Sequence, residues 1–299
     1  MAIVPFIGST GTIDMGYNLL PVYQTGPHTC VLLDTGFNFD YHKLTAALNA
    51  SGLTPTGAIV THMHIDHHGG SAWLKRDYGT QIAMPVGEAA VLANPITLYR
   101  QMDYFARTPE EQREVDTTLR QLPDVVIQPD CTQLDFCGAT FAIQHIPGHS
   151  RDLIAVTTPD DVCYVSDAFI CGGLLEKARL PYCEHWALDY ESKRQLMQQT
   201  HTGWIVAHKG TITGDVRPII QQNLDMMNQR MDDFEALLAQ PMTREQFDTA
   251  VRKMLGMHSL APDRMMHHSR HTRPYLEQLV LTGRVKMLGV DNALLYQKA

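Results

Sequence analysis

The sequence predicts an α/β fold. Short apolar runs rich in β-branched residues alternate along the chain with segments of helical periodicity. Several of these runs end directly in a histidine or an aspartate, which is typical of α/β proteins that carry functional groups at strand ends. The 299 residues are 44% hydrophobic and 19% charged, so the chain can bury a sizeable core and its composition argues against disorder.

Strands are predicted where apolar, β-branched and aromatic residues lie between turn-forming residues. The predicted strands are Tyr17–Tyr23, Thr29–Leu33, Ala58–Val60, Gln81–Met84, Val125–Gln128, Thr140–Gln144, Leu153–Thr157, Val162–Ser166 and Trp204–Ala207. Residues at helical spacing predict helices over Tyr41–Ser51, Ala72–Tyr78 and Tyr190–His201.

A helical insertion is predicted over residues 85–122. Asn94-Pro95 interrupts it, and Thr108-Pro109-Glu110-Glu111 restarts it with an acidic first turn. Its aromatic and apolar side chains recur at helical spacing at Tyr99, Met102, Phe105 and Ala106. This face either packs on the core or forms a cap that shapes an apolar acyl pocket, and both interpretations stay open.

The strongest functional signal is the run Thr61-His62-Met63-His64-Ile65-Asp66-His67-His68-Gly69-Gly70, directly after the apolar run Ala58-Ile59-Val60. It places three imidazoles and a carboxylate within six residues, at His62, His64, Asp66 and His67. Neutral imidazole and carboxylate are the ligands that suit zinc and neighbouring divalent metals. So many ionisable groups at a strand end would be costly without a cation to neutralise them. The run therefore predicts a metal site.

This run resembles the His-x-His-x-Asp-His signature of the metallo-β-lactamase superfamily, whose members mostly hold two metal ions. The resemblance implies further ligands at the ends of later strands, and the sequence has them in order at His149, Asp167 and His208. It also implies that Asp34, after the run Val31-Leu32-Leu33, supports the ligands without binding metal itself. The match spans residues 17–210 and implies a four-layer αββα sandwich, with two sheets face to face and helices outside.

The resemblance assigns seven ligands to two ions: His62, His64 and His149 to the first, Asp66, His67 and His208 to the second, and Asp167 to both. Residues two apart on an extended segment point to the same side, so the first two histidines can converge on one ion. Three protein ligands with an open position are typical of catalytic zinc. We expect two divalent ions, zinc first, with manganese or iron as alternatives.

These expectations describe a hydrolase in which metal-bound hydroxide cleaves a small carboxyl ester, lactone or thioester. Asp66 and Asp167 belong to the catalytic set as well as to the ligand set. A phenol could hold the oxyanion that forms at the carbonyl, and Tyr182 and Tyr190 are the two candidates. The partner would be a small-molecule acyl substrate.

Two other function classes stay open. A phosphodiesterase or nuclease on the same fold would need Lys and Arg residues that grip phosphate, and Lys209 beside His208 is the one cation that suggests it. An iron-dependent oxygenase or redox protein is the other class. The complete second ligand set argues against mononuclear dioxygenase relatives. His64 stands where the flavin-linked di-iron relatives usually have glutamate.

Charge and N-terminal sequence bound the partners and the compartment. The net charge of −8 would change to about −4 with two divalent ions bound, which disfavours nucleic acid as a partner. The six cysteines form no CxxC pair. Met1–Phe6 lacks the basic start and apolar length of a signal peptide, and no stretch of about 20 apolar residues occurs. We therefore expect a cytoplasmic protein without a membrane span.

The pattern changes after residue 215, which predicts a catalytic domain over residues 1–215 and a C-terminal extension over residues 216–299. The predicted elements of the extension are a helix from Pro218 capped by Asp215, a helix opened by the capping box Thr243-x-x-Gln246, a third helix over Tyr275–Gly283, and a hairpin of Arg284–Leu288 and Ala293–Gln297. This order resembles a winged-helix module. Because its basic residues are few, we expect the extension to mediate homodimerisation or to wall the substrate pocket.

Overall fold

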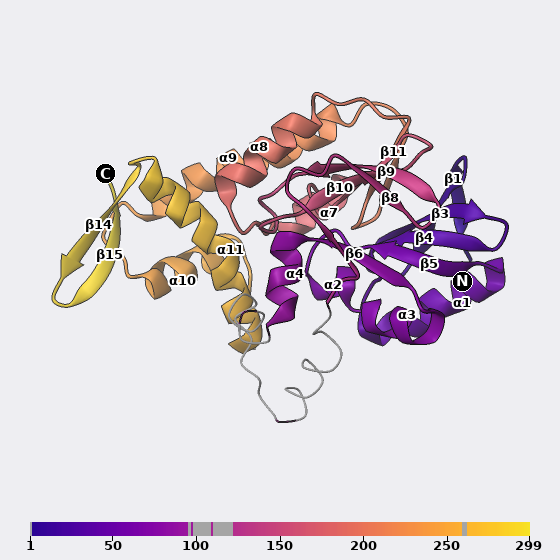
Figure 1. Ribbon diagram of the computed structural model, residues 1–299. Helices are drawn as coiled ribbons and strands as arrows, with labels where there is room; N and C mark the ends of the chain where they lie inside the picture. The colour runs from indigo at the N-terminus through magenta and orange to yellow at the C-terminus, as the bar shows by residue number, and fades with distance from the viewer. Residues whose placement is uncertain (1, 95–96, 98–108, 110–121, 259–261) are drawn as a thin grey trace.

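Two β-sheets pack face to face in the computed structural model, with helices on both outer faces (Figure 1). The structure describes residues 2–94, 97, 109, 122–258 and 262–299. Within these residues the first sheet has seven strands in chain order: β1 (Val4–Ile7), β2 (Thr10–Asp14), β3 (Leu19–Gly26), β4 (Thr29–Leu33), β5 (Thr54–Ile59), β6 (Gln81–Pro85) and β7 (Val125–Ile127). The second has six in the spatial order β13 (Gly210–Ile212), β12 (Gly203–Val206), β11 (Val162–Ser166), β10 (Ile154–Thr157), β9 (Ala139–His145) and β8 (Gln133–Phe136).

The inner faces of the two sheets form the central core. β4 to β7 are parallel to one another, and β11 is parallel to β12, while the other pairs are antiparallel. The side chains buried between the sheets include Val31, Leu33, Ile59, Phe141, Ile143, Ile154, Val156, Tyr164 and Ile205. Parallel strands covered on both faces read as continuous apolar runs, which is why the sequence shows β4 and β11 so clearly.

Helices cover the outer faces and complete four layers, the αββα sandwich that the sequence resemblance implied. α1 (Tyr41–Ser51), α3 (Ser71–Tyr78) and α4 (Val86–Ala93) pack against the first sheet. The short helices η1 (Asn38–Asp40) and α2 (Ile65–His68) follow β4 and β5 in the chain. The second sheet lies against α8 (Trp186–Leu196) and α9 (Arg217–Leu237), and α7 (Gly172–Ala178) precedes α8 in the chain. Across the ranges that the structure covers, no helix combines the length and apolar character needed to cross a membrane.

The C-terminal extension has a core of its own. After α9 come α10 (Arg244–Met254), α11 (Pro262–Leu281) and an antiparallel hairpin of β14 (Val285–Val290) and β15 (Ala293–Lys298). Its buried side chains include Met231, Phe234, Phe247, Tyr275 and Leu279. Leu180 and Cys183 from the segment before α8 join the same cluster, so the extension packs directly on the preceding part of the chain. Three helices followed by a hairpin match the winged-helix order predicted from sequence.

The structure also differs from the sequence prediction. The sequence patterns do not predict β1, β2, β8 and β13. β2 and β13 contain glycine and β8 alternates polar and apolar residues, so these three give little apolar signal. β1 contains Pro5, which is unfavourable within a strand. α8 begins at Trp186 rather than Tyr190, since His185 Nδ1 accepts a hydrogen bond from Leu188 N (3.3 Å) and caps the helix. The capping box at Thr243 is confirmed. The predicted insertion face with Tyr99, Met102, Phe105 and Ala106 lies outside the described residues, and α4 is the described helix of this segment.

Gly148→Ala is expected to destabilise the protein. Gly148 has a φ of +136°, and an added Cβ would lie 2.1 Å from the backbone N and Cα of Asp189. The clash of this Cβ with the Asp189 backbone and the strain of a positive φ at an alanine should together lower the free energy of unfolding by about 3 kcal/mol or more. Chemical denaturation measures this change. Gly173→Ala is the matched control, because a Cβ there meets no atom within 4 Å. Equal stability of the two variants would contradict this account.

Candidate metal centre

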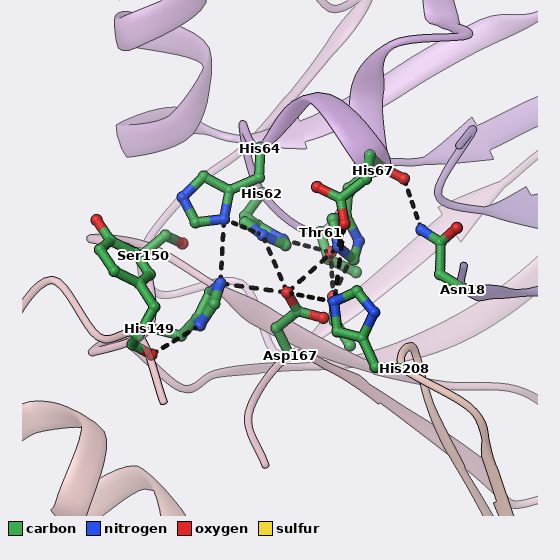
Figure 2. Close-up of polar contacts among 12 residues, drawn as sticks. Asn18, Thr61, His62, His64, His67, His149, Ser150, Asp167 and His208 are labelled. Atoms are coloured by element: carbon green, nitrogen blue, oxygen red, sulfur yellow. Dashed lines mark hydrogen bonds and ion pairs between the residues drawn. The ribbon is translucent and has the colours of Figure 1, made fainter. Parts of the chain in front are cut away.

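The predicted ligands follow strand ends that meet at one edge of the two sheets (Figure 2). Four of them follow β5 and continue into α2. Asp167 follows β11, His208 follows β12, and His149 lies in the turn between β9 and β10. β4 is parallel to β5 and β11 is parallel to β12, so each pair brings its carboxyl ends to one edge.

The side chains form two donor sets that share one carboxylate. The sets are His62, His64, His149 and Asp167, and Asp66, His67, His208 and Asp167. Within each set the donor atoms lie within 4.8 Å of one another. Asp167 Oδ2 lies 3.3 Å from His149 Nε2 and 3.3 Å from His208 Nε2, so this carboxylate faces both sets. The grouping is the one that the sequence resemblance implied.

The donor sets fit divalent metal ions. His67 Nε2 and Asp167 Oδ1 are buried, and neither makes a hydrogen bond with any residue that the structure describes. A buried polar atom without a partner costs about 1–3 kcal/mol, and a bound cation would remove this cost. Imidazole and carboxylate donors accept zinc, manganese or iron, with the choice set by geometry and availability. These residues could therefore hold two ions.

Burial keeps the imidazoles of the first set neutral. It lowers the pKa of His62 and His64, and neighbouring imidazoles lower it further. Burial also lowers the pKa of His149. Burial by itself would raise the pKa of Asp167, but the imidazoles of His208 and His67 hold that pKa well below its usual range. Neutral imidazole and ionised carboxylate are the protonation states that bind metal.

Asp34 fixes the orientation of His67. Its carboxylate is fully buried and accepts a hydrogen bond from His67 Nδ1 (2.7 Å), which leaves Nε2 facing the second donor set. The same carboxylate accepts hydrogen bonds from Thr61 N (2.7 Å) and from the Tyr164 hydroxyl (2.6 Å). The superfamily resemblance implied this role for Asp34, which is to support a metal ligand without binding metal itself. Tyr164 is an addition, because its sequence context marks it only as a strand residue.

Glu88 ties together the two segments that carry the first donor set, a role that no pattern in the sequence indicates. It lies in the first turn of α4 and is fully buried. One carboxylate oxygen accepts hydrogen bonds from Ser150 Oγ (2.7 Å) and Asp152 N (2.8 Å), and the other accepts one from Met63 N (3.1 Å). Burial raises the pKa of Glu88 to about 7. The only sequence signal was a lone acid in the apolar segment Val86–Ala93.

A cavity of about 780 Å³ opens beside the donors, a size that suits a small molecule. Its polar wall includes the ligands His64, Asp66, His149, Asp167 and His208. Its apolar wall includes Phe37, Ile65, Phe169, Ile170, Leu174 and Leu180. α11 of the extension contributes His267, Arg270 and His271. The extension is therefore part of the cavity wall.

The two candidate tyrosines lie in different surroundings. The Tyr182 ring lines the cavity, with its centroid 5.4 Å from the rings of His64 and His149, and its hydroxyl accepts a hydrogen bond from Arg270 (3.0 Å). Burial raises the pKa of Tyr182 to about 12, so the phenol keeps its proton. Tyr190 instead stacks on Trp186 (4.9 Å) and is not among the described residues that line the cavity.

Residues 22–182 match the family described as the metallo-beta-lactamase superfamily, which is more than half of the chain. The chain belongs to this superfamily. Superfamily members are generally hydrolases. A hydroxyacylglutathione hydrolase from Synechococcus sp. is 33% identical over 115 residues, which are 38% of this chain and 34% of that protein. The match thus spans about a third of the length of that relative.

Solved superfamily structures share the fold over nearly the whole chain. A beta-lactamase domain protein from Burkholderia ambifaria aligns with a TM-score of 0.73 at 18% identity, covering 99% of this chain and 93% of that one. A metallo-beta-lactamase family protein from Thermus thermophilus aligns with a TM-score of 0.72 at 20% identity, covering 99% and 97%. Because both alignments include the C-terminal extension, the extension is shared by superfamily proteins of low sequence identity.

Glu88→Ala is expected to weaken metal binding at the first donor set by about 10–100-fold, since that carboxylate holds both ligand segments. The measurement is a Co²⁺ titration followed by absorption, with thermal melting of the same samples. Asp248→Ala is the control: Asp248 is a buried carboxylate in the extension that accepts hydrogen bonds from Arg244 (2.9 Å) and Thr272. It should lower stability and leave Co²⁺ affinity unchanged. Equal loss of affinity in both variants would mean that Glu88 acts only through general stability.

Proposed function

We propose that this superfamily member is a hydrolase that uses two divalent ions, zinc first with manganese or iron as alternatives, to cleave a small carboxyl ester, lactone or thioester. The observation that carries the proposal is the pair of donor sets sharing Asp167 at the wall of a cavity with apolar sides. The Synechococcus relative, a hydroxyacylglutathione hydrolase, also supports acyl chemistry.

The residues of the site have separable roles. His62, His64 and His149 would hold the first ion, Asp66, His67 and His208 the second, and Asp167 both. When bound, such ions lower the pKa of water and polarise a carbonyl oxygen. Asp34 keeps the His67 proton on Nδ1, and Glu88 holds the segments of the first set in place. The apolar wall excludes water from the acyl group.

Tyr182 can stabilise negative charge on the substrate carbonyl oxygen. Its hydroxyl accepts a hydrogen bond from Arg270 and keeps its own proton to donate. A phenol whose oxygen already accepts a bond from a cation is a stronger donor, because hydrogen bonds in a chain polarise one another. Its ring centroid lies 5.4 Å from the rings of His64 and His149, so the phenol belongs to the cavity wall beside the first donor set.

Phosphodiester hydrolysis is the second candidate function. Lys209 follows His208 and lines the cavity, as do Lys177, Lys193 and Arg270. These cations could contact phosphate oxygens. The aliphatic and aromatic wall favours the acyl class, which is why we place phosphodiesters second.

The proposed function is tested on protein purified without added metal. We expect about two metal ions per chain and hydrolysis of p-nitrophenyl acetate, a lactone or an acyl thioester, but not of bis(p-nitrophenyl) phosphate. Asp167→Asn should lower turnover by at least roughly 100-fold while the protein stays folded, because the shared donor is weakened. Full metal content and activity in that variant would sink the assignment of Asp167. Phosphodiester turnover alone would favour the second candidate, and bound iron without any hydrolysis would point to oxygen or redox chemistry.

Tyr182→Phe should lower kcat by about 10²–10³-fold with little change in KM, the usual effect of losing one oxyanion donor. Steady-state kinetics on the best ester of the panel measures this. Tyr190→Phe is the matched control, since Tyr190 stacks on Trp186 and accepts a hydrogen bond from Asn228 (3.2 Å) away from the cavity lining. A similar kcat for both variants would remove Tyr182 from the mechanism.

A further inference from the structure

Most of the charged side chains in the cavity wall are positive. Among the described residues of the wall, four carry positive charge at neutral pH: Lys177, Lys193, Lys209 and Arg270. The carboxylates among them are Asp66 and Asp167, both members of the metal donor sets. The chain as a whole carries a net charge of −8. Positive side chains are therefore concentrated at this cavity, although the chain as a whole is negatively charged.

Two of the four cations already have a carboxylate close by. Lys193 Nζ lies 2.5 Å from Asp189 Oδ2, and both side chains are buried. Lys209 Nζ lies 3.7 Å from Asp14 Oδ1 near the surface. Lys177 on α7 differs, because it makes no ion pair or hydrogen bond within the described part of the chain. It is exposed to solvent at the cavity wall.

Arg270 is held at the same wall by Tyr182. Its guanidinium donates a hydrogen bond to the Tyr182 hydroxyl (3.0 Å) and lies 5.1 Å from the centre of that ring. The next residue, His271, contacts the Leu180 carbonyl oxygen through Nδ1 (3.0 Å). This contact ties α11 to the segment that follows α7, so the segments that carry Lys177 and Arg270 are neighbours.

We propose that the substrate is an acyl compound with a negatively charged group remote from the scissile carbonyl, and that Lys177 and Arg270 bind this group. The inference rests on the proposed hydrolase function and specifies its substrate class. Leu174, Leu180 and Pro181 line the same cavity and would contact the carbon chain between the two ends of the substrate. A carboxylate and a phosphonate or phosphate share the required chemistry, since guanidinium and ammonium groups bind both.

Three matched esters test the proposal on the metal-loaded protein: p-nitrophenyl valerate, mono-p-nitrophenyl glutarate and p-nitrophenyl 4-phosphonobutyrate. The first two differ by a terminal carboxylate in place of a methyl group, and the third carries a phosphonate instead. We expect kcat/KM to be on the order of 10-fold higher for an acidic ester than for the valerate, and the ratio to fall with added salt. The better of the two acidic esters identifies the kind of anion.

Lys177→Met should reduce this ratio to about one, and Arg270→Met should reduce it as well. Arg273→Met is the control on the same helix, because Arg273 contacts Glu277 (2.7 Å) and is not among the described residues of the cavity wall. The Arg273→Met variant should show the same ratio of kcat/KM values, acidic ester over valerate, as the unmodified protein. Equal kcat/KM for all three esters, unaffected by Lys177→Met, would overturn the inference and leave the proposed hydrolase function standing.

A binding measurement separates failure of the inference from failure of the proposed function. If neither these esters nor the lactone and the thioester of the earlier panel are hydrolysed, the proposed function fails, and calorimetry with glutaramate and valeramide still tests the anion site. These amides differ by the same carboxylate and need no turnover. Glutaramate binding about 10-fold tighter than valeramide binding, with the difference lost in Lys177→Met, would support the anion site. Equal or absent binding of both would overturn it.

Discussion

Both the sandwich and the candidate metal centre depend on the hydrogen bonds that the buried Asp34 carboxylate accepts. It follows β4 of the first sheet and accepts hydrogen bonds from Thr61 after β5, from His67 on α2 and from Tyr164 on β11 of the second sheet. A buried carboxylate without such partners would cost several kcal/mol, so the two sheets and the ligand segment have one arrangement that satisfies it. That arrangement also leaves His67 Nε2 as the ring nitrogen that faces the metal donors.

The His149 turn is held from two sides. α4 binds it through Glu88, which accepts hydrogen bonds from Ser150 and Asp152. α8 lies so close on the other side that only glycine fits at position 148. Because Glu88 also binds Met63, between two ligands, the first donor set keeps its geometry through contacts of its supporting segments. Such support limits the reorganisation needed when a metal ion binds.

The C-terminal extension contributes side chains to the cavity wall. Arg284 pairs with Glu235 and with Asp232 (2.7 Å), and Arg244 pairs with Asp248. All three pairs lie within the extension. Arg270 is directed toward Tyr182 and the cavity instead.

The sequence by itself predicted an α/β fold and a metal site at the run from His62 to His67. Its resemblance to a known superfamily implied the αββα sandwich and the three later ligands, because His149, Asp167 and His208 follow strand ends in the expected order. Contacts between distant segments decided the rest. Glu88 reads as an ordinary acid in the first turn of a helix until Met63 and Ser150 are seen to bond to it. Tyr182 and Tyr190 are equivalent in sequence, but only Tyr182 lies between the metal donors and Arg270. Burial and the packing of one segment on another set these roles, and neither is encoded by local spacing.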